Sequence, residues 1–191
     1  MTWRSFSGKT PSSLALIELS SIARGIDTTD QMLKAADVKL VMARTICSGK
    51  YMVMVAGELA DIEASVAAGL ATSREATIDH FVIPDVHPAV FPAVAGTSVA
   101  IKHGALGVIE AFSVAALVEA IDLVAKAALV EMVGCRLAMA LGGKAYLTFT
   151  GDVDAVKFAM EAGVEVVARR GLLVNQVVIP DPRPELFHSL S

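Results

Sequence analysis

The chain of 191 residues is poor in several residue types that mark large classes of protein. Two cysteines are too few for a disulfide framework, so both are expected to stay reduced. Charged residues make up only 19% of the chain, and the net charge is −4. The 16 Lys and Arg residues are scattered along the sequence, whereas a nucleic-acid-binding surface needs them clustered. We therefore expect no nucleic-acid partner.

Long hydrophobic runs are also absent, although 54% of the residues are hydrophobic. No segment approaches the roughly 18 uninterrupted apolar residues that would span a membrane. The first ten residues have no apolar core of the kind found in secretory signals. These features predict a cytoplasmic protein without a membrane partner. The surplus of Ala and Val further predicts that part of the apolar surface is buried between subunits.

Sequence patterns of common enzymes are missing as well. The chain has no Gly-rich phosphate loop, no serine nucleophile elbow and no zinc-ligand spacing. Its four histidines are spread so that no helical or turn spacing brings two together. The sequence therefore predicts a protein that is not an enzyme.

What the chain does contain is an internal repeat. Leu14–Glu18 returns as Leu106–Glu110, and Asp30–Ala36 returns as Asp122–Ala128, both 92 positions later. Of the 33 positions from 14 to 46, 12 are identical to their partner, where chance would give roughly two or three. The offset later grows to 94 and then to 96, and we expect both jumps to lie in loops. Two copies of one small domain are therefore fused in tandem.

Each copy has the pattern strand, helix, strand, strand, helix, strand. In the first copy we expect strands at 14–19, 39–46, 51–56 and 80–83 and helices at 28–36, capped by Asp27 or Thr28, and 58–72. In the second copy we expect strands at 105–111, 131–138, 145–150 and 173–179 and helices at 114–128 and 152–168.

This order of elements predicts an α/β (α+β) fold of two ferredoxin-like β-α-β-β-α-β domains. Prolines and glycines between Asp85 and Gly104 indicate connecting chain. We place a tail at 1–13, the first domain at 14–91, a linker at 92–104 and the second domain at 105–191.

Four motifs occur once in each copy: a Leu-Gly-x-Ile-Glu-like strand, an Asp-x-x-x-Lys-Ala-Ala helix, a Gly-Lys hairpin turn and a Val-Ile-Pro ending. Together they resemble the bacterial microcompartment shell family, whose tandem members form pseudohexameric trimers that tile a polyhedral shell. Residues 18–25 and 45–50 are most similar to the iron-sulfur-carrying trimeric type of propanediol-utilisation compartments. The resemblance implies a shell location, with further copies of the chain, other shell proteins and enclosed enzymes as partners.

A ring of three such chains would repeat any loop near its axis three times. The resemblance places the two hairpin turns there, with an expected pore lining of Ile46, Cys47, Ser48, Gly49, Leu141, Gly142 and Gly143. Three copies of Cys47 would supply three thiolates to a 4Fe-4S cluster and leave the fourth iron to a non-protein ligand. The residues alone favour a simpler interpretation, in which Cys47 is an ordinary thiol and the glycines are ordinary turn residues.

The resemblance also assigns Lys34 and Lys126 to the tile edge, and we expect Arg183 to act there in place of the family arginine that is missing at position 181. In an arbitrary protein, a lysine near the end of a helix would more often be solvated and favoured by the helix dipole. The chain departs from the family pattern at Asp85 and Asp181, where an arginine often follows Ile-Pro.

Two functions fit these observations. The first is a structural shell tile whose central pore holds a 4Fe-4S cluster for electron transfer or passes small metabolites. The alternative is a ferredoxin-like oligomer that senses a small ligand, because the same topology hosts such sensors. Glu18 and Glu110 are charged residues within apolar strands, so we expect a structural role for both, with Lys side chains or backbone N–H groups as partners.

Overall fold

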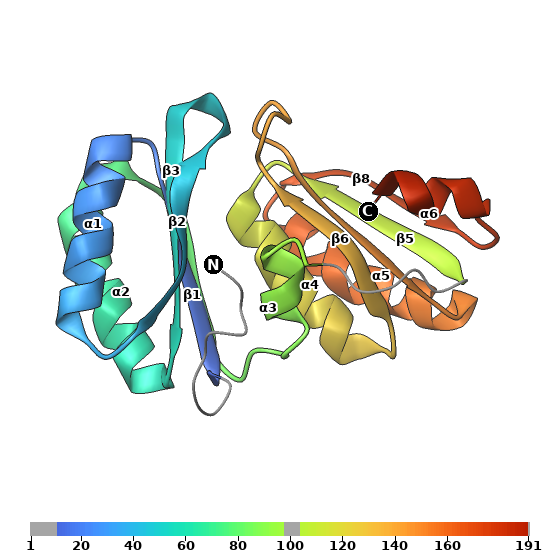
Figure 1. Cartoon of the computed structure of the whole chain (residues 1–191), viewed down its shortest axis with the longest axis horizontal. Helices are drawn as coiled ribbons and strands as arrows, with labels where there is room; N and C mark the ends of the chain where they lie inside the picture. The colour runs from blue at the N-terminus through green and yellow to red at the C-terminus, as the bar shows by residue number, and fades with distance from the viewer. Residues whose placement is uncertain (1–10, 98–103, 191) are drawn as a thin grey trace. The chain divides into compact units, whose positions relative to one another are not determined.

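The computed structural model describes residues 11–97 and 104–190, apart from the side chain of His188. Most of the expected tail at 1–13 and much of the expected linker at 92–104 therefore lie outside the described residues. The chain forms two compact units that divide between Val86 and His87. Figure 1 shows the helices and strands of both units.

The first unit alternates strands and helices in the expected order. Its elements are β1 (Ser13–Leu19), α1 (Ile22–Ala35), β2 (Lys39–Ile46), β3 (Lys50–Gly57), α2 (Leu59–Ser73) and β4 (Thr77–Ile83). The strands lie side by side in the order β2-β3-β1-β4, and every neighbouring pair is antiparallel. Short 3-10 turns occupy Cys47–Gly49 and Arg74–Ala76.

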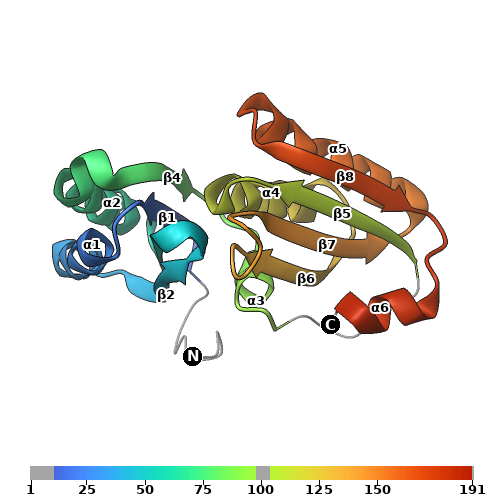
Figure 2. The same cartoon turned by 90° about the horizontal axis from the view of Figure 1, so that it is seen from above.

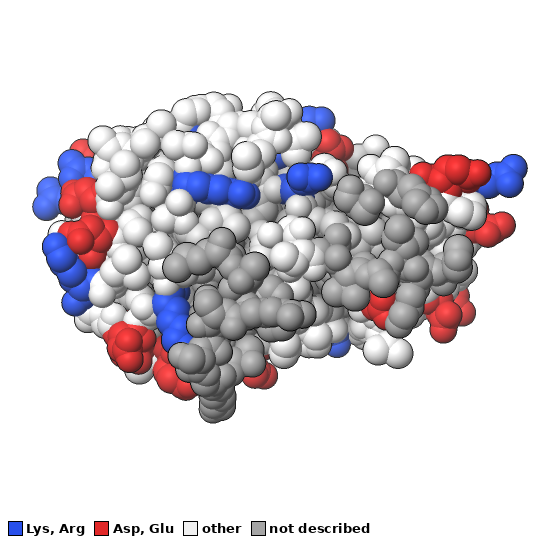
Figure 3. Space-filling view, viewed as in Figure 1, with Lys and Arg blue, Asp and Glu red and all other residues white. Residues whose placement is uncertain are grey.

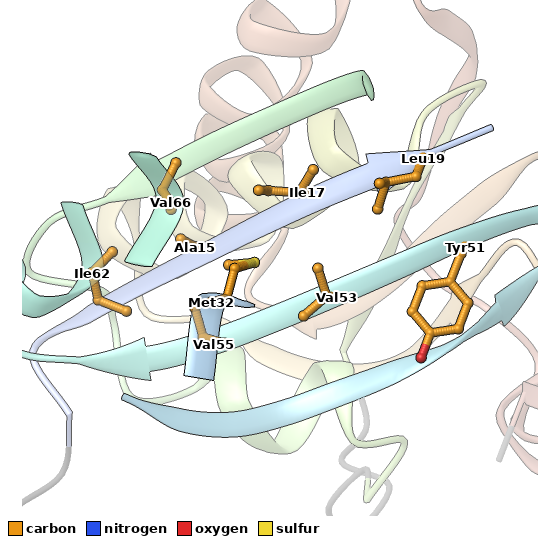
Figure 4. Packing of buried hydrophobic residues seen from close by; sticks show 9 residues of the cluster. All are labelled: Ala15, Ile17, Leu19, Met32, Tyr51, Val53, Val55, Ile62 and Val66. Carbon is orange, nitrogen blue, oxygen red and sulfur yellow. The ribbon is translucent and has the colours of Figure 1, made fainter. Parts of the chain in front are cut away.

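The core of this unit lies between the sheet and the two helices, which cover the same face of the sheet (Figure 1). Alternate residues of the two central strands point to that face because side chains alternate along a strand. Figure 4 shows the resulting cluster of Ala15, Ile17, Leu19, Met32, Tyr51, Val53, Val55, Ile62 and Val66. Burial of each larger side chain contributes roughly 1.5–3 kcal/mol, so this face sets the register of β1 and β3.

The second unit repeats the first element by element. It contains β5 (Ala105–Ala111), α4 (Val114–Ala127), β6 (Glu131–Leu137), β7 (Ala145–Gly151), α5 (Val153–Arg169) and β8 (Leu173–Ile179). Its sheet has the corresponding strand order β6-β7-β5-β8. Two tandem ferredoxin-like domains are thus confirmed as the fold.

Two short helices were not expected from the sequence. Helix α3 (Val90–Val94) contacts β6 and α4, and four of its five residues are buried. Helix α6 (Pro184–Leu190) lies on the sheet face opposite to α5 (Figures 1 and 2). There Phe187 is 1% exposed and packs with Leu106 and Val133. Helices this short depend on such tertiary contacts, which a local pattern does not reveal.

The predicted start of helix α1 was wrong. The helix begins at Ile22 rather than at residue 28, and its cap is Ser21, whose side chain accepts a hydrogen bond from the Arg24 N–H at 3.3 Å. Asp27 and Thr28 therefore lie inside the helix. Gly25 weakens the helical pattern, but it is required because a Cβ there would lie 2.4 Å from Cδ1 of Tyr51.

The two length differences between the copies fall in different kinds of element. The first lies in the hairpin loop, as expected, because residues 138–144 replace the three-residue turn Cys47–Gly49. The second was expected in a loop but lengthens a helix, since α5 has 17 residues and α2 has 15. The added residues lie at the end of α5, so they leave the packed face of the helix in register.

Candidate functional site

The turn between β2 and β3 carries the cysteine that the sequence singled out. Ile46 is buried at the end of β2, Cys47 is half-buried, and Ser48 and Gly49 are exposed. Ser48 (φ 65°) and Gly49 (φ 69°) both have left-handed backbone conformations, which reverse the chain within three residues. The turn thus places the Cys47 thiol at the tip of the hairpin, next to a sharp reversal that few residue types tolerate.

The turn between β6 and β7 occupies the same place in the second unit and is longer. Gly142 and Gly143 have positive φ, and so do Ala138 (φ 49°) and Ala140 (φ 58°). A Cβ added at Gly49 or Gly142 would meet nothing within 4 Å. Within one chain, backbone conformation rather than crowding therefore accounts for these glycines. Leu141 and Gly143 are half-buried and Gly142 is exposed. The expected pore residues thus lie in one turn of each unit, except Ile46, which ends the strand before the first turn.

An ion pair lies at the base of each turn. Lys50 Nζ is 2.9 Å from Glu18 Oε1, and Lys144 Nζ is 2.9 Å from Glu110 Oε1. Lys50 is the first residue after its turn, and Lys144 is the last residue of its turn. Each ion pair therefore connects the end of a turn to a central strand of the same sheet, β1 or β5. The expected structural role of both glutamates is thereby confirmed, with Lys side chains as the partners.

The two ion pairs differ in burial. The Glu18 side chain is 2% exposed and that of Lys50 27%, whereas the values for Glu110 and Lys144 are 32% and 40%. Removing one partner of a buried pair strands an uncompensated charge, while water can solvate an exposed one. In the whole chain, Glu18–Lys50 is thus the more buried of the two pairs.

The two cysteines occupy different environments. Cys135 lies in β6, is 9% exposed and pairs in register with Leu147, as expected for a core residue. Neither cysteine forms a disulfide. Within residues 11–97 and 104–190, no three His, Cys, Asp or Glu side chains are grouped so that they could hold a metal ion.

The expected edge lysines lie in equivalent last turns of their helices. Lys34 of α1 contacts Asp30 at 2.5 Å, and Lys126 of α4 contacts Asp122 at 2.6 Å. The Asp30 side chain is 52% exposed, but that of Asp122 is 5% exposed and also accepts a hydrogen bond from the His87 N–H at 2.7 Å. The sequence reasoning did not name these pairs, although the Asp-x-x-x-Lys spacing allows them because residues four apart are neighbours on a helix.

Charge is unevenly distributed on the visible face of the first unit. In Figure 3 acidic and basic side chains gather over α1, while the surface over the tip of the β2–β3 hairpin is largely uncharged. The helix carries the exposed pairs Arg24–Asp27 and Lys34–Asp30. Arg183, the third expected edge residue, is exposed between β8 and α6 in the other unit. Helix α1 therefore offers polar contacts, whereas the hairpin tip offers small residues and a thiol.

Comparison with known protein families agrees with the repeated fold. The model of the BMC domain matches residues 13–86 and again residues 105–182. The chain belongs to the BMC domain family. It is a tandem-domain member of this family of bacterial microcompartment shell proteins, since both of its units match.

Several relatives resemble this tandem BMC protein over most of its length. The bacterial microcompartment shell protein PduT of Citrobacter freundii is 36% identical over 93% of this chain and 96% of its own. The carboxysome assembly protein CcmO of Synechococcus elongatus is 32% identical over 93% of this chain and 68% of its own. A crystal structure of a microcompartment protein from Desulfitobacterium hafniense is 43% identical, with a TM-score of 0.86 over 92% of this chain and 98% of that one.

A fused permuted hexameric shell protein from the RMM microcompartment shares the fold, with a TM-score of 0.62 and 21% identity over 81% of each chain. Among the described residues, no helix of the BMC protein is long and apolar enough to cross a membrane.

The difference in burial between the two ion pairs predicts different effects on stability. Lys50→Met should lower the free energy of unfolding by about 2–4 kcal/mol, because it strands the buried Glu18 carboxylate. Lys144→Met should lower it by about 0–1 kcal/mol, because water can solvate Glu110. Urea unfolding of both variants measures the difference. Equal losses would contradict the assigned burial.

Proposed function

We propose that the chain is a non-catalytic shell tile built as a homotrimer, with six BMC domains around a central axis. Membership of the BMC domain family supports this proposal, and so does the tandem repeat of one complete domain. Closed symmetry is the common solution for such chains, and a threefold ring of two similar domains has pseudo-sixfold shape. Other shell proteins would contact the tile laterally, and enzymes would lie within the compartment that it encloses.

We further propose that the β2–β3 turns of three chains meet at the axis and that their Cys47 thiolates hold a 4Fe-4S cluster. The observation that carries this step is the position of Cys47, half-buried at the tip of a sharp turn of small residues. Thiolates are the usual ligands of such clusters, and three chains would supply three of them.

A bound cluster would supply one-electron transfer between the two sides of the shell. The chain's own part is to fix the three thiolates and to surround the axis with small side chains and backbone from Ser48 and Gly49. Without a cluster, the same turns would line an opening for small metabolites. Family membership favours both forms of this shell function over the alternative of a small-ligand sensor.

The cluster proposal predicts iron that depends on one cysteine. Anaerobically reconstituted protein should contain about four irons per trimer, with the broad visible absorbance of an iron-sulfur centre. Cys47→Ser should lose the iron and the absorbance because it removes all three protein ligands at once. Iron analysis of the purified trimer checks the prediction.

Cys135→Ala is the matched control for this experiment, because the equivalent position of the first unit is occupied by Ala43. It removes the other thiol of each chain and should leave the iron content unchanged. Iron near zero in the unmutated protein would refute the cluster and leave the metabolite opening. Iron retained by Cys47→Ser would refute the assigned ligand.

The edge assignment predicts a change in lateral assembly. Lys34→Ala should weaken the extended sheets formed by the tiles but leave the trimer intact, because its exposed pair with Asp30 contributes at most about 0.5 kcal/mol to the chain itself. Electron microscopy of assembled sheets measures the effect. Lys126→Ala is a less clean test, since it strands the buried Asp122.

Lys157→Ala provides the control, because Lys157 is an exposed helix lysine outside the two expected edge positions. Sheets should form as usual in this variant. Undiminished sheets in Lys34→Ala would show that Lys34 does not act at the edge.

A further inference from the structure

The segment that follows the last strand of each domain is repeated along with the domain. At an offset of 96 positions, His-Pro-Ala-Val-Phe at 87–91 corresponds to Arg-Pro-Glu-Leu-Phe at 183–187. The first of these segments leads into α3 and the second into α6. Both begin with the same turn, in which the N–H of the fourth residue donates to the carbonyl of the first at 3.0 Å, Val90 to His87 and Leu186 to Arg183. Helices α3 and α6 are therefore equivalent elements of the repeat.

Helix α3 shows where such a segment can bind. It follows the first domain in the sequence but belongs to the second unit, where it contacts α4 and the edge strand β6. At the start of this segment the His87 N–H donates to Asp122 Oδ1 at 2.7 Å, while Asp122 Oδ2 binds Lys126 at 2.6 Å. The segment that ends one domain thus docks on the first helix and the edge strand of the next domain.

The equivalent surface of the first unit is formed by α1 and the edge strand β2. Asp30 of α1 corresponds to Asp122, and its Oδ2 likewise binds the lysine four positions later, Lys34, at 2.5 Å. A second contact, from Gln31, is also at Oδ2, so no described residue donates to Asp30 Oδ1. Among the described residues, the first unit thus has the acceptor but not the backbone donor that the second unit has.

Helix α1 also carries an apolar stripe beside Asp30. Ile22, Ile26 and Leu33 lie on the same side of the helix as Asp30, because these positions follow one another at intervals of three or four. They are 40%, 57% and 38% exposed, whereas the core of the unit uses another side of α1, which contains Met32. Exposed apolar side chains gathered around a polar acceptor are typical of a protein–protein contact.

We propose that α1 and β2 of one chain bind the segment 183–190 of a second copy of the chain, with Asp30 Oδ1 accepting a hydrogen bond from the Arg183 N–H. The proposal rests on the homotrimer proposed above, in which the domain after the second one is the first domain of the next chain. Of the two equivalent segments, the one that contains α3 is already bound within the second unit. The one that contains α6 is therefore the candidate for α1 and β2.

Helix α6 can make this contact without leaving its own sheet. Phe187 is buried there and holds the helix, whereas Arg183, Glu185 and Ser189 are exposed. One side of the segment is therefore anchored within its own unit, and the other side is open to a second chain.

Cysteine pairs test the contact in the full chain, in a Cys47→Ser/Cys135→Ala background. Asp30→Cys/Arg183→Cys should form disulfides between chains under mild oxidation, because residues in such a contact lie within the range that a disulfide spans. Gel electrophoresis without reductant should show covalent dimers and trimers. The matched pair His87→Cys/Asp122→Cys joins the equivalent positions within one unit, so it should form its disulfide within the chain and migrate as a monomer.

Arg24→Cys/Arg183→Cys is the negative control, because Arg24 is exposed on the side of α1 away from the apolar stripe. It should cross-link chains at least about tenfold more slowly than Asp30→Cys/Arg183→Cys. Equal rates of the two pairs, or no covalent dimers from the Asp30 pair, would overturn the proposal. A disulfide within one chain from the Asp30 pair would also overturn it, because α6 would then bind α1 of its own chain.

Native mass spectrometry of the background variant separates this proposal from the proposed function. A trimer without the expected cross-link would overturn the contact but leave the trimeric tile intact. A monomer would contradict both.

Discussion

The pairing of a strand glutamate with the lysine that ends the hairpin turn is the interaction on which the rest of this structure depends. Glu18 is a charged residue within a strand that is buried along its whole length, so its position is tolerable only while Lys50 reaches it. The β1–β3 ladder joins the β2–β3 hairpin to the central strand as far as Leu19 and Tyr51, and the ion pair adds a side-chain contact from the next residue, Lys50, to the same strand. The hairpin carries Cys47 at its tip.

Comparison of the two units shows where one fold varies and where it does not. The core positions and helix caps are equivalent, as the capping contacts of Ser21 and Ser113 illustrate. The differences concentrate at the hairpin turns and at the carboxylates that hold the lysines. Loops and half-exposed ion pairs can change without disturbing the core. Two copies of a domain can therefore differ there at low cost in stability. In the proposed trimer, the one Cys47 of each chain becomes part of a shared site only through symmetry.

The sequence predicted the fold well because each strand and helix pattern occurs in both copies of the domain. Each assignment could therefore be compared with its counterpart. It failed at the start of α1, where Gly25 obscured the first turn, although Ser113 at the matching position of the other copy could have indicated Ser21 as the cap. It also missed α3 and α6, whose formation depends on contacts distant in the sequence. For the site, it identified the turns and the Asp-x-x-x-Lys helices. It could not tell the buried Glu18–Lys50 pair from its exposed counterpart, because burial is a property of the packed chain.

The central claim is that three chains meet at one axis through the Cys47 turn and share a single metal centre. Native mass spectrometry of the anaerobically reconstituted protein tests this most directly, because it counts chains and bound inorganic mass in the same particle. The account predicts one dominant species of three chains, each of 19.9 kDa, with the mass of one 4Fe-4S cluster added. A stable monomer or dimer at micromolar concentration, or a trimer without added mass, would contradict it.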